Sequence, residues 1–210
     1  MSRLVLLVLL LLPVLAGADN QAASLYFSCS SCHGDAGQGS PAINAPALAG
    51  QDADYLARQL QHFSSGIRGS HQGDIWGRQM ALMAANLLEE DLNPLANYIA
   101  AMPPWEATRL ETAVDSATPA LYEACAACHG KAGEGNPMLG SPRIAGLEHR
   151  YIALQLRNFR DGVRGASASD SYGNQMRAAI SPNLDDPAID KMASYIHSMQ
   201  YSGPAGKAGG

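Results

Sequence analysis

The stretch Cys29-Ser30-Ser31-Cys32-His33-Gly34 decides how this chain folds, because it returns as Cys125-Ala126-Ala127-Cys128-His129-Gly130 at an offset of 96 residues. The likeness extends well beyond the motif: residues 29–80 and 125–176 share 23 identities in 52 positions without a gap. After Met80 the register moves by one residue. A period near 96 is much longer than the roughly 20–45 residues of a solenoid repeat. The chain is therefore predicted to contain two copies of one domain.

The first 18 residues have the pattern of a secretory signal peptide. Arg3 supplies a positive charge, residues 4–15 are almost all apolar, and Ala16-Gly17-Ala18 is a small-residue cleavage site. The apolar run is shorter than the about 20 residues that a membrane-spanning helix needs, although an uncleaved anchor remains an alternative. We expect cleavage after Ala18 and export to the bacterial periplasm.

Helical patterns fill both copies, and no segment has the alternation typical of a strand. Helices are expected at residues 21–28, after Asp52 as a cap, and after Asp186 as the cap of the last helix. Pro94 predicts that the equivalent helix of the first copy either starts near Asn93 or is kinked. The predicted boundaries are a signal peptide at 1–18, a first domain at 19–102, a linker at 103–118, a second domain at 119–201 and a disordered tail at 202–210.

The composition limits both the class of protein and the content of its interior. A net charge of −5 argues against a nucleic-acid-binding protein. Only 2 Trp, 8 Tyr and 3 Phe occur in 210 residues, so something other than aromatic side chains is expected to occupy two small cores. The charge is uneven: residues 19–106 carry nine acids and three bases, whereas residues 107–210 carry ten of each. The resulting charge dipole is expected to orient the protein during encounters, so that the acidic first domain and the neutral second domain dock different partners.

A Cys-x-x-Cys-His sequence is the attachment signature of a c-type haem. Two thiols one helical turn apart can add to the two vinyl groups of a porphyrin, and the adjacent histidine then ligates the iron. A disulfide, a thioredoxin-like redox pair and a zinc site are the alternatives. The motif is duplicated in an exported helical chain, so we predict two covalently bound haem c groups, whose porphyrins supply the missing core. The haem-free chain is then expected to fold poorly. The predicted attachment residues are Cys29, Cys32, Cys125 and Cys128.

The ligands of each iron decide between an electron carrier and a catalyst. Iron with His and Met ligands suits electron transfer, whereas an open position binds oxygen or peroxide. His33 and His129 are the predicted proximal ligands. Met80 and Met176 are the predicted distal ligands, since both follow Gly-x-Gln at matched positions, in what we expect to be a loop before the last helix. The other residues of these types receive different assignments: Met102 to the linker region, Met192 and Met199 to the core, and His62, His71, His149 and His197 to the surface.

Two further matched pairs are candidates for supporting each haem. The second nitrogen of a ligating histidine needs a hydrogen-bond partner, and Pro46 and Pro142 each lie 13 residues after a motif histidine with a free carbonyl. The alternative role of these prolines is a simple turn. Arg68 and Arg164 are candidates to pair with a haem propionate, or else to cap the end of the preceding helix.

Together these features resemble the di-haem cytochrome c4 family. The resemblance rests on the paired Cys-x-x-Cys-His units, the Pro-x-Leu/Ile-Ala-Gly segments (46–50 and 142–146), Tyr-Leu/Ile-x-x-Gln-Leu and the late Gln-Met, and it covers about residues 22–199. Residues 45–48 are also similar to the proline segment of single-haem class I cytochromes c, in which the proline carbonyl holds the proximal histidine. The resemblance implies an all-α fold of two tandem class I cytochrome c domains. Each domain would wrap around one covalent haem c, with a pseudo-twofold axis between them and the propionate edges near the interface.

The resemblance also implies a function. Members of this family are periplasmic, soluble or loosely membrane-associated, and they pass electrons from a quinol–cytochrome c reductase to a haem–copper terminal oxidase. An alternative is a di-haem subunit of an oxidoreductase complex such as flavocytochrome c sulfide dehydrogenase. Because both copies carry the same methionine, we expect an electron-transfer protein rather than a di-haem peroxidase or a thiosulfate-oxidising enzyme. Neither a nucleic acid nor a small-molecule substrate is expected.

Overall fold

A computed structural model describes residues 12–104, 117–180 and 184–199 of the chain. Most of the predicted signal peptide (1–11), most of the predicted linker (105–116) and the predicted tail (202–210) lie outside these described residues. The cleavage after Ala18 and the linker and tail assignments therefore stay predictions.

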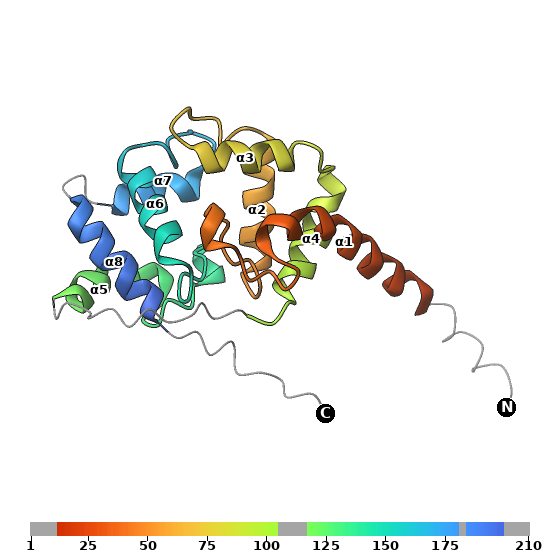
Figure 1. The fold of residues 1–210 in the computed structure, drawn as a ribbon, viewed down its shortest axis with the longest axis horizontal. Helices are drawn as coiled ribbons and strands as arrows, with labels where there is room; N and C mark the ends of the chain where they lie inside the picture. The colour runs from red at the N-terminus through yellow and green to blue at the C-terminus, as the bar shows by residue number, and fades with distance from the viewer. Residues whose placement is uncertain (1–11, 105–116, 181–183, 200–210) are drawn as a thin grey trace, which may run out of the picture.

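Two units of four α-helices each lie side by side (Figure 1). In the part of the chain that the structure describes, β contacts are limited to isolated bridges, Ser40 with Ala45 and Asn136 with Ser141. The predicted all-α fold is therefore confirmed. The first unit comprises α1 (Leu12–His33), the 3-10 turn η1 (Pro41–Ile43), α2 (Ala53–Ser64), α3 (Ile75–Ala84) and α4 (Glu89–Ala100), and the second comprises α5 (Thr118–His129), η2 (Pro137–Leu139), α6 (His149–Arg160), α7 (Ser171–Ala179) and α8 (Asp186–Ser198).

Local sequence sets where the helices begin. The Asp52 carboxylate accepts a hydrogen bond from Tyr55 N at 2.8 Å and caps α2, as predicted. In α8 the cap is Asp185, one residue before the predicted Asp186. A capping carboxylate bonds an amide two or three residues later, and Asp185 reaches Ala188 N at 2.8 Å across that spacing.

Pro94 lies inside α4, which begins at Glu89, so the predicted start near Asn93 is wrong. The proline ring removes the amide that would bond the carbonyl of Glu90. Pro94 and Glu90 are both exposed, so water can satisfy this carbonyl. The apolar face of the helix continues past the proline, and Leu95 is completely buried.

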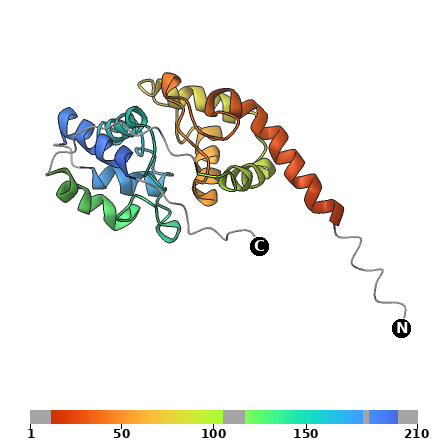
Figure 2. The same ribbon diagram turned by 60° about the horizontal axis from the view of Figure 1, so that its bottom comes forward.

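Each unit buries one face of its last helix. α4 packs against α1 and α2, and α8 packs against α5 and α6 (Figure 2). The core of the first unit centres on Leu95 and Ile99, and that of the second on Ile189 and Ile196. Both cores are small and mainly aliphatic, in keeping with the low aromatic content of the chain. This packing places the end of each motif helix beside the loop that follows it.

Candidate functional site

The two Cys-x-x-Cys-His motifs form the last turn of α1 and of α5. Residues three apart on a helix are neighbours on its surface, so the two thiols of each motif face one region. All four cysteines are free, and among the described residues no group of three or more His, Cys, Asp or Glu side chains converges as a metal site. Burial raises the pKa of the Cys29 and Cys125 thiols.

The two motif histidines are buried and oriented by proline carbonyls. Nδ1 of His33 lies 2.8 Å from Pro46 O, and Nδ1 of His129 lies 2.9 Å from Pro142 O. A carbonyl can only accept, so Nδ1 carries the proton and Nε2 keeps its lone pair for a metal. Burial lowers the pKa of both imidazoles. The neutral form is favoured, and this is the form that a metal ligand requires.

Glycines allow each proline to approach its histidine. Gly39 has a φ of +80°, and a Cβ there would lie 2.7 Å from the carbonyl carbon of Pro46. Gly135 repeats this arrangement with a φ of +85° and a distance of 2.8 Å to Pro142. Only glycine combines a positive φ with so close an approach. The loop after each histidine can therefore fold back against the proline segment.

A tyrosine on each motif helix holds the start of the same loop. Tyr26 Oη donates to Gly34 O at 2.7 Å, and Tyr122 Oη donates to Gly130 O at 2.8 Å. Both side chains are buried. Burial raises the pKa of Tyr26 to about 12 and also raises the pKa of Tyr122. The hydroxyl groups therefore remain protonated donors at neutral pH.

Met80 and Met176 lie on helices, so the predicted loop position of these methionines is wrong. Met80 is in α3 and Met176 is in α7, and both are half-buried. The helices begin where Asp74 accepts a hydrogen bond from Gly77 N, and the matched aspartate of the second unit caps α7 in the same way. This Asp-x-x-Gly spacing was the signal in the sequence for a helix start. One turn before Met80, Trp76 lies on the same side of α3 and is also half-buried.

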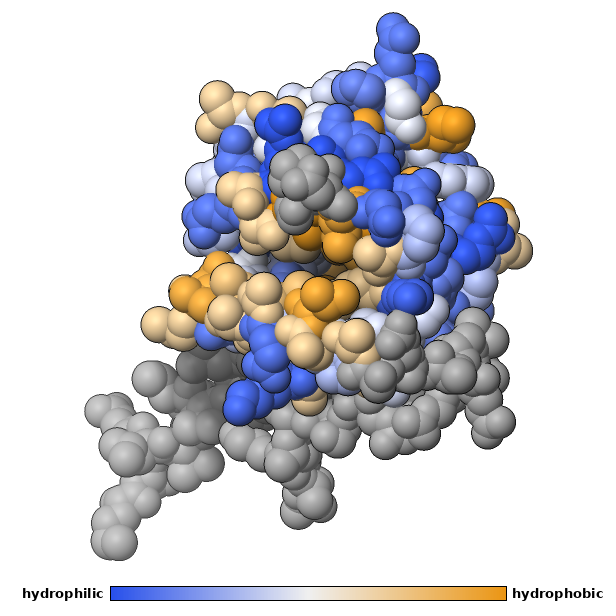
Figure 3. All heavy atoms as spheres, turned by 90° about the vertical axis from the view of Figure 1, so that its left-hand side faces the viewer, coloured by the Kyte–Doolittle hydropathy of each residue, from blue (hydrophilic) through white to orange (hydrophobic). Residues whose placement is uncertain are grey.

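The face of the second unit is hollowed, and apolar side chains gather around the hollow (Figure 3). A porphyrin is a flat apolar group that needs such a surface, two thiols and an iron ligand. The second unit supplies free thiols on α5 and a histidine whose Nε2 is available. The residues present therefore fit a covalently attached haem.

A second matched pair of methionines packs into the cores. Met102 stands at the predicted boundary between the first domain (19–102) and the linker region, and it packs against the core of the first unit, where it matches Met199 at an offset of 97. A Cβ on Gly37 would lie 3.0 Å from Met102 Sδ, and a Cβ on Gly133 would lie 3.0 Å from Met199 Sδ. Both methionines fill space under the loops that follow the motif histidines. The one-residue shift in register after Met80 hid this match.

Arg68 and Arg164 meet at the interface between the two units. Arg68 donates to Gln59 Oε1 of its own unit at 2.6 Å and to Gln155 Oε1 of the other at 3.1 Å. Arg164 mirrors this pattern, with Gln155 at 2.8 Å and Gln59 at 2.9 Å. Both arginines are buried. These reciprocal contacts relate the units by a pseudo-twofold axis, and the guanidinium groups bond side chains across the interface instead of helix ends.

Two tyrosines complete this interface cluster, which we define as Tyr55, Gln59 and Arg68 with their counterparts Tyr151, Gln155 and Arg164. Arg164 Nη2 lies 3.2 Å from Tyr55 Oη, and Arg68 Nη2 lies 3.4 Å from Tyr151 Oη. Burial acts to raise the pKa of Tyr55, but Arg164 and Arg68 outweigh it and lower the pKa. Among the described residues, the buried Nε atoms of Arg58 and Arg68 have no hydrogen-bond partner. The interface thus gathers positive charge and available N–H groups, which suit an anion.

Comparison with known proteins identifies the family. The cytochrome c family model matches residues 20–103 and again residues 117–200. The chain belongs to the cytochrome c family. Cytochrome c4 from Azotobacter vinelandii is 32% identical over 191 residues, which cover 81% of this chain and 84% of that protein. The thiosulfate dehydrogenase electron acceptor from Stutzerimonas stutzeri (strain A1501) is 31% identical over 86% of this chain and 81% of that protein. The crystal structure of reduced recombinant cytochrome c4 from Pseudomonas stutzeri matches with a TM-score of 0.71 at 27% identity, over 87% of this chain and 98% of that one.

These matches confirm membership of the cytochrome c4 family, which the motifs had indicated. The protein is a di-haem cytochrome c with two covalently bound haem c groups, folded as two tandem cytochrome c domains, and it is an electron carrier. None of the helices that the structure describes is both long enough and apolar enough to cross a membrane.

Arg143 makes a buried contact between the domains of this cytochrome that the repeat does not duplicate. Arg143 is 2% exposed and stands where the first unit has Ala47. Gln51 Nε2 donates to Arg143 O at 2.9 Å and Gln51 Oε1 accepts from Arg143 N at 2.9 Å. The guanidinium donates to Ala49 O at 2.9 Å and to Ala145 O at 2.7 Å. Sequence reasoning missed this bridge, whose only signal was an arginine in place of a small residue beside the proline.

Two histidines of this cytochrome that were predicted at the surface are buried, so that prediction is wrong for both. His197 Nδ1 donates to Leu147 O at 2.8 Å. His62 is 7% exposed, and its Nδ1 lies 3.7 Å from Asp170 Oδ1 of the other unit. Each histidine occurs in one copy only, and the repeat therefore gave no signal for its contact. His71 is exposed, as expected.

Proposed function

We propose that the chain is an exported electron carrier in which each unit binds its haem through its own motif and its own methionine. The iron of each haem supplies a one-electron couple between the ferric and ferrous states. Ligation by one histidine and one methionine would leave neither iron an open position for oxygen or peroxide. The first haem is bound by Cys29, Cys32, His33 and Met80, and the second by Cys125, Cys128, His129 and Met176.

One observation carries this proposal: the same set of groups occurs twice at matched positions. In each unit a proline carbonyl orients a buried histidine, and a half-buried methionine lies on a capped helix. A di-haem catalyst needs an open or unusually ligated iron, whereas two matched sets support two similar six-coordinate irons. Met102 and Met199 are engaged in core packing and do not compete as ligands.

The interface cluster supports a role for arginines in holding haem propionates. Arg68 and Arg164 are buried together with Arg58 close by, and this positive charge needs anions near it. The available Nε atoms of Arg58 and Arg68 can donate charge-assisted hydrogen bonds. We therefore assign one propionate of each haem to this interface. Pro46 and Pro142 complete the support by fixing the proximal histidines.

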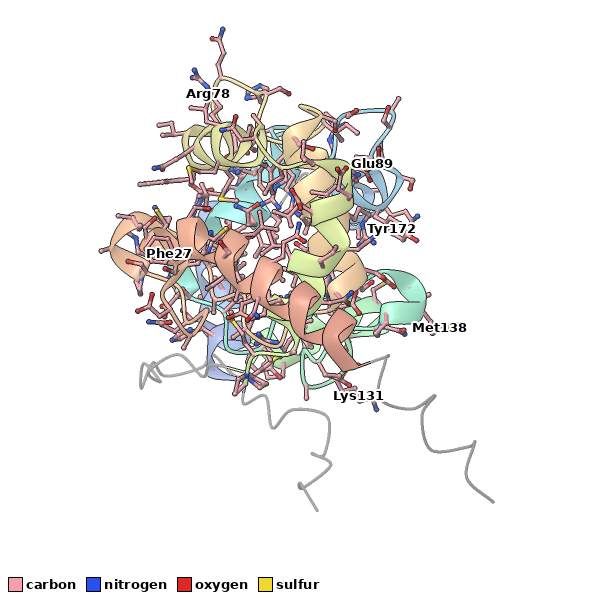
Figure 4. All side chains as sticks on the ribbon, turned by 90° about the vertical axis from the view of Figure 1, so that its right-hand side faces the viewer. Phe27, Arg78, Glu89, Lys131, Met138 and Tyr172 are labelled. Carbon is pink, nitrogen blue, oxygen red and sulfur yellow. The ribbon has the colours of Figure 1, made fainter. Side chains whose placement is uncertain are left out.

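The two units offer different surfaces to partner proteins. On α3, Ile75 and Leu82 are 70% and 75% exposed, and helical spacing puts them on the same side as Arg78, which points away from the body in Figure 4. The matched residues of α7 are Ser171 and Ala178, so the fold itself does not require large apolar groups there. These side chains and the acidic charge of the first unit support its docking to one redox partner. The second unit would serve the other partner.

The spectra of the purified full-length holoprotein test the ligands. We expect two haems per chain, both low-spin and unable to bind carbon monoxide. Met80→Ala and Met176→Ala should each convert one haem to a high-spin form that binds carbon monoxide. Met102→Leu and Met199→Leu are the matched controls and should leave both haems low-spin. A high-spin haem in the unaltered protein would overturn the proposal.

The partners are proposed from the family. In the periplasm, loosely associated with the membrane, the carrier would accept electrons from a quinol–cytochrome c reductase and deliver them to a haem–copper terminal oxidase. A second candidate donor follows from the relative named a thiosulfate dehydrogenase electron acceptor. Stopped-flow reduction of this cytochrome by each purified donor at low and high salt separates the two. The physiological donor should react faster, with a rate that depends on salt because the first unit is acidic.

A further inference from the structure

Two buried carboxylates connect the methionine helices to the interface between the units. Asp74 Oδ1 accepts from Gly77 N at 2.9 Å and Asp170 Oδ1 accepts from Gly173 N at 2.8 Å, which caps α3 and α7. Asp74 is 3% exposed and Asp170 is 5% exposed. A charge next to either carboxylate therefore acts at low dielectric, at the start of a helix that carries a proposed iron ligand.

Each carboxylate faces the same repeat position of the opposite unit, and the residue at that position differs. Asp74 Oδ1 lies 3.5 Å from Nδ2 of Asn158. Asp170 Oδ1 lies 3.7 Å from Nδ1 of His62. His62 and Asn158 match at the offset of 96, and both are buried. The same contact between the units therefore occurs twice about the pseudo-twofold axis. Asp74 contacts a neutral amide, whereas Asp170 contacts an imidazole that can gain a proton.

The charges around His62 act in opposite directions. Burial lowers the pKa of His62, and Asp170 raises it. Three arginines lower the pKa further, namely Arg58 on the same helix and Arg164 and Arg68 of the interface cluster. The net pKa lies below the usual histidine value of about 6.5. Nδ1 of His62 has no hydrogen-bond partner among the described residues, so a proton added there can be donated to Asp170.

We propose that His62 links proton uptake to reduction of the second haem, and that the first haem lacks this link. One electron from the donor protein reduces the second iron, which loses one positive charge, and one proton from water binds to Nδ1 of His62. Linkage makes the effect reciprocal: protonated His62 at the cap of α7 raises the reduction potential of the second haem. Asn158, which faces the cap of α3, cannot bind a proton in this range. The inference rests on the proposed ligation of the second haem by Met176.

This link makes the distribution of the electron depend on pH. In mildly acidic solution the potential of the second haem rises relative to that of the first, so electrons that enter through the first unit pass more favourably to the second. As the pH rises past the pKa of His62, this preference declines. The carrier would therefore direct electrons more strongly across the interface when the surrounding compartment is acidic.

The test is a spectroelectrochemical titration of both haems in the full-length holoprotein from about pH 5 to about pH 8, the range in which histidines titrate. In the unaltered protein one potential should fall as the pH rises, with a slope below one proton per electron. His62→Asn, which places the residue of one copy in the other, should flatten that slope. Asn158→His should make the potential of the first haem depend on pH. The double variant His62→Asn/Asn158→His should move the pH dependence from the second haem to the first. Met176→His replaces the methionine ligand of the second haem and should lower only that haem's potential, which identifies the measured potential that belongs to the second haem.

Haem count and low-spin spectra of every variant separate this inference from the proposed ligation. If the protein without substitutions lacks two low-spin haems, the proposed ligation is contradicted. If the His62 variants keep two low-spin haems and the same dependence of potential on pH as the protein without substitutions, the proton link is contradicted. His62→Gln provides a second removal of the imidazole if His62→Asn folds poorly. The proposal is overturned if the slope of the second haem persists in both His62 variants, or if both haems lose slope equally.

Discussion

The two units share a fold and a haem motif, yet the second unit adds ion pairs to the packing of its last helix that the first unit lacks. In the second unit, Arg157 and Arg160 of α6 form ion pairs with Asp186 and Asp190 of α8. In the first unit, α2 and α4 make the equivalent packing contact without these pairs. Gln61 and Ser64 stand where the second unit has its two arginines, so the acidic Glu89 has no basic partner at these positions, and the fourth matched residue is the neutral Asn93.

What the units keep in common lies around the motif. Both have the histidine bonded to a proline carbonyl, the glycine beside it and the tyrosine that holds the following loop. The two cores exchange one aliphatic side chain for another, as at Leu56 and Ile152, and the differences in polarity and charge lie on the surface or between the units. The comparison teaches that the haem pocket fixes the side chains around it, whereas the interface and the partner-facing surface leave each unit free to differ. The repeat therefore acts as an internal control for every substitution.

The largest expected effect tests the common part. Replacing Cys125 and Cys128 by alanine should reduce the haem count from two to one and unfold the second unit, because its small core depends on the porphyrin. Far-ultraviolet circular dichroism should then lose on the order of half of the helical signal, since the bound group stabilises only the folded state. A pyridine haemochrome assay gives the haem count.

The matched control replaces Cys29 and Cys32 and should remove the first haem with a similar loss of helix. Equal losses would show that both units depend on their porphyrins to the same extent. A single-haem protein that kept its full helical signal and unfolded cooperatively would show that these cores are complete without the porphyrin.

The parts that could be predicted from sequence are those that depend on local residues. The motif, the proline 13 residues later and the cap at Asp52 each follow from short-range spacing, and the repeat showed the motif and the proline twice, whereas Glu148 stands where the first copy has Asp52 and makes no cap hydrogen bond. The loop predicted around Met80 failed for a local reason: Asp74 and Gly77 have the spacing of a helix cap, and that signal was not used. The error therefore lay in the interpretation, not in the information that the sequence contains.

The contacts between the units could not be predicted in the same way. His62 is polar and occurs in one copy, so its sequence context is that of a surface residue. The opposite unit covers His62 and places Asp170 Oδ1 3.7 Å from its Nδ1. Arg143 is a similar case, since its acceptor Ala49 O belongs to the other unit. No periodicity within one helix encodes which residues of two copies will face each other.

An intermediate loss of stability is expected when the contact that Arg143 makes between the units is removed. Arg143→Ala restores the small residue of the first unit but leaves Ala49 O and Ala145 O without their charged donor. Buried hydrogen bonds to charged groups contribute about 1.5–3 kcal/mol each in mutational series, with partial compensation by water, so we expect a loss of about 2–4 kcal/mol in the free energy of unfolding. Chemical denaturation of the holoprotein measures it.

The exposed Arg150 of the same unit is the matched control. Arg150→Ala should change the free energy of unfolding by less than about 0.5 kcal/mol, as is usual for surface substitutions. If Arg143→Ala were equally mild, the hydrogen bonds of the guanidinium to Ala49 O and Ala145 O would contribute nothing measurable to the stability of the protein.

The smallest effect is expected at the matched tyrosines. Tyr26→Phe and Tyr122→Phe each remove one hydrogen bond to a glycine carbonyl and should each lower the free energy of unfolding by about 1 kcal/mol at neutral pH. The two values should agree closely, because the donor distances are 2.7 and 2.8 Å and both rings are buried. Denaturant unfolding of the two holoprotein variants provides the comparison.

The pH dependence of this loss identifies the hydroxyl as its cause. In the folded state the pKa of Tyr26 is raised to about 12, whereas an unfolded tyrosine ionises near pH 10. The stabilisation is therefore complete below about pH 10 and is lost as the pH rises toward 12, because the unfolded chain releases its proton first. The advantage of the unaltered protein over Tyr26→Phe should shrink above pH 10 and then reverse. A difference that stayed constant across this range would show that the hydroxyl of Tyr26 ionises equally in the folded and unfolded chain, and would contradict its burial and its hydrogen bond to Gly34 O.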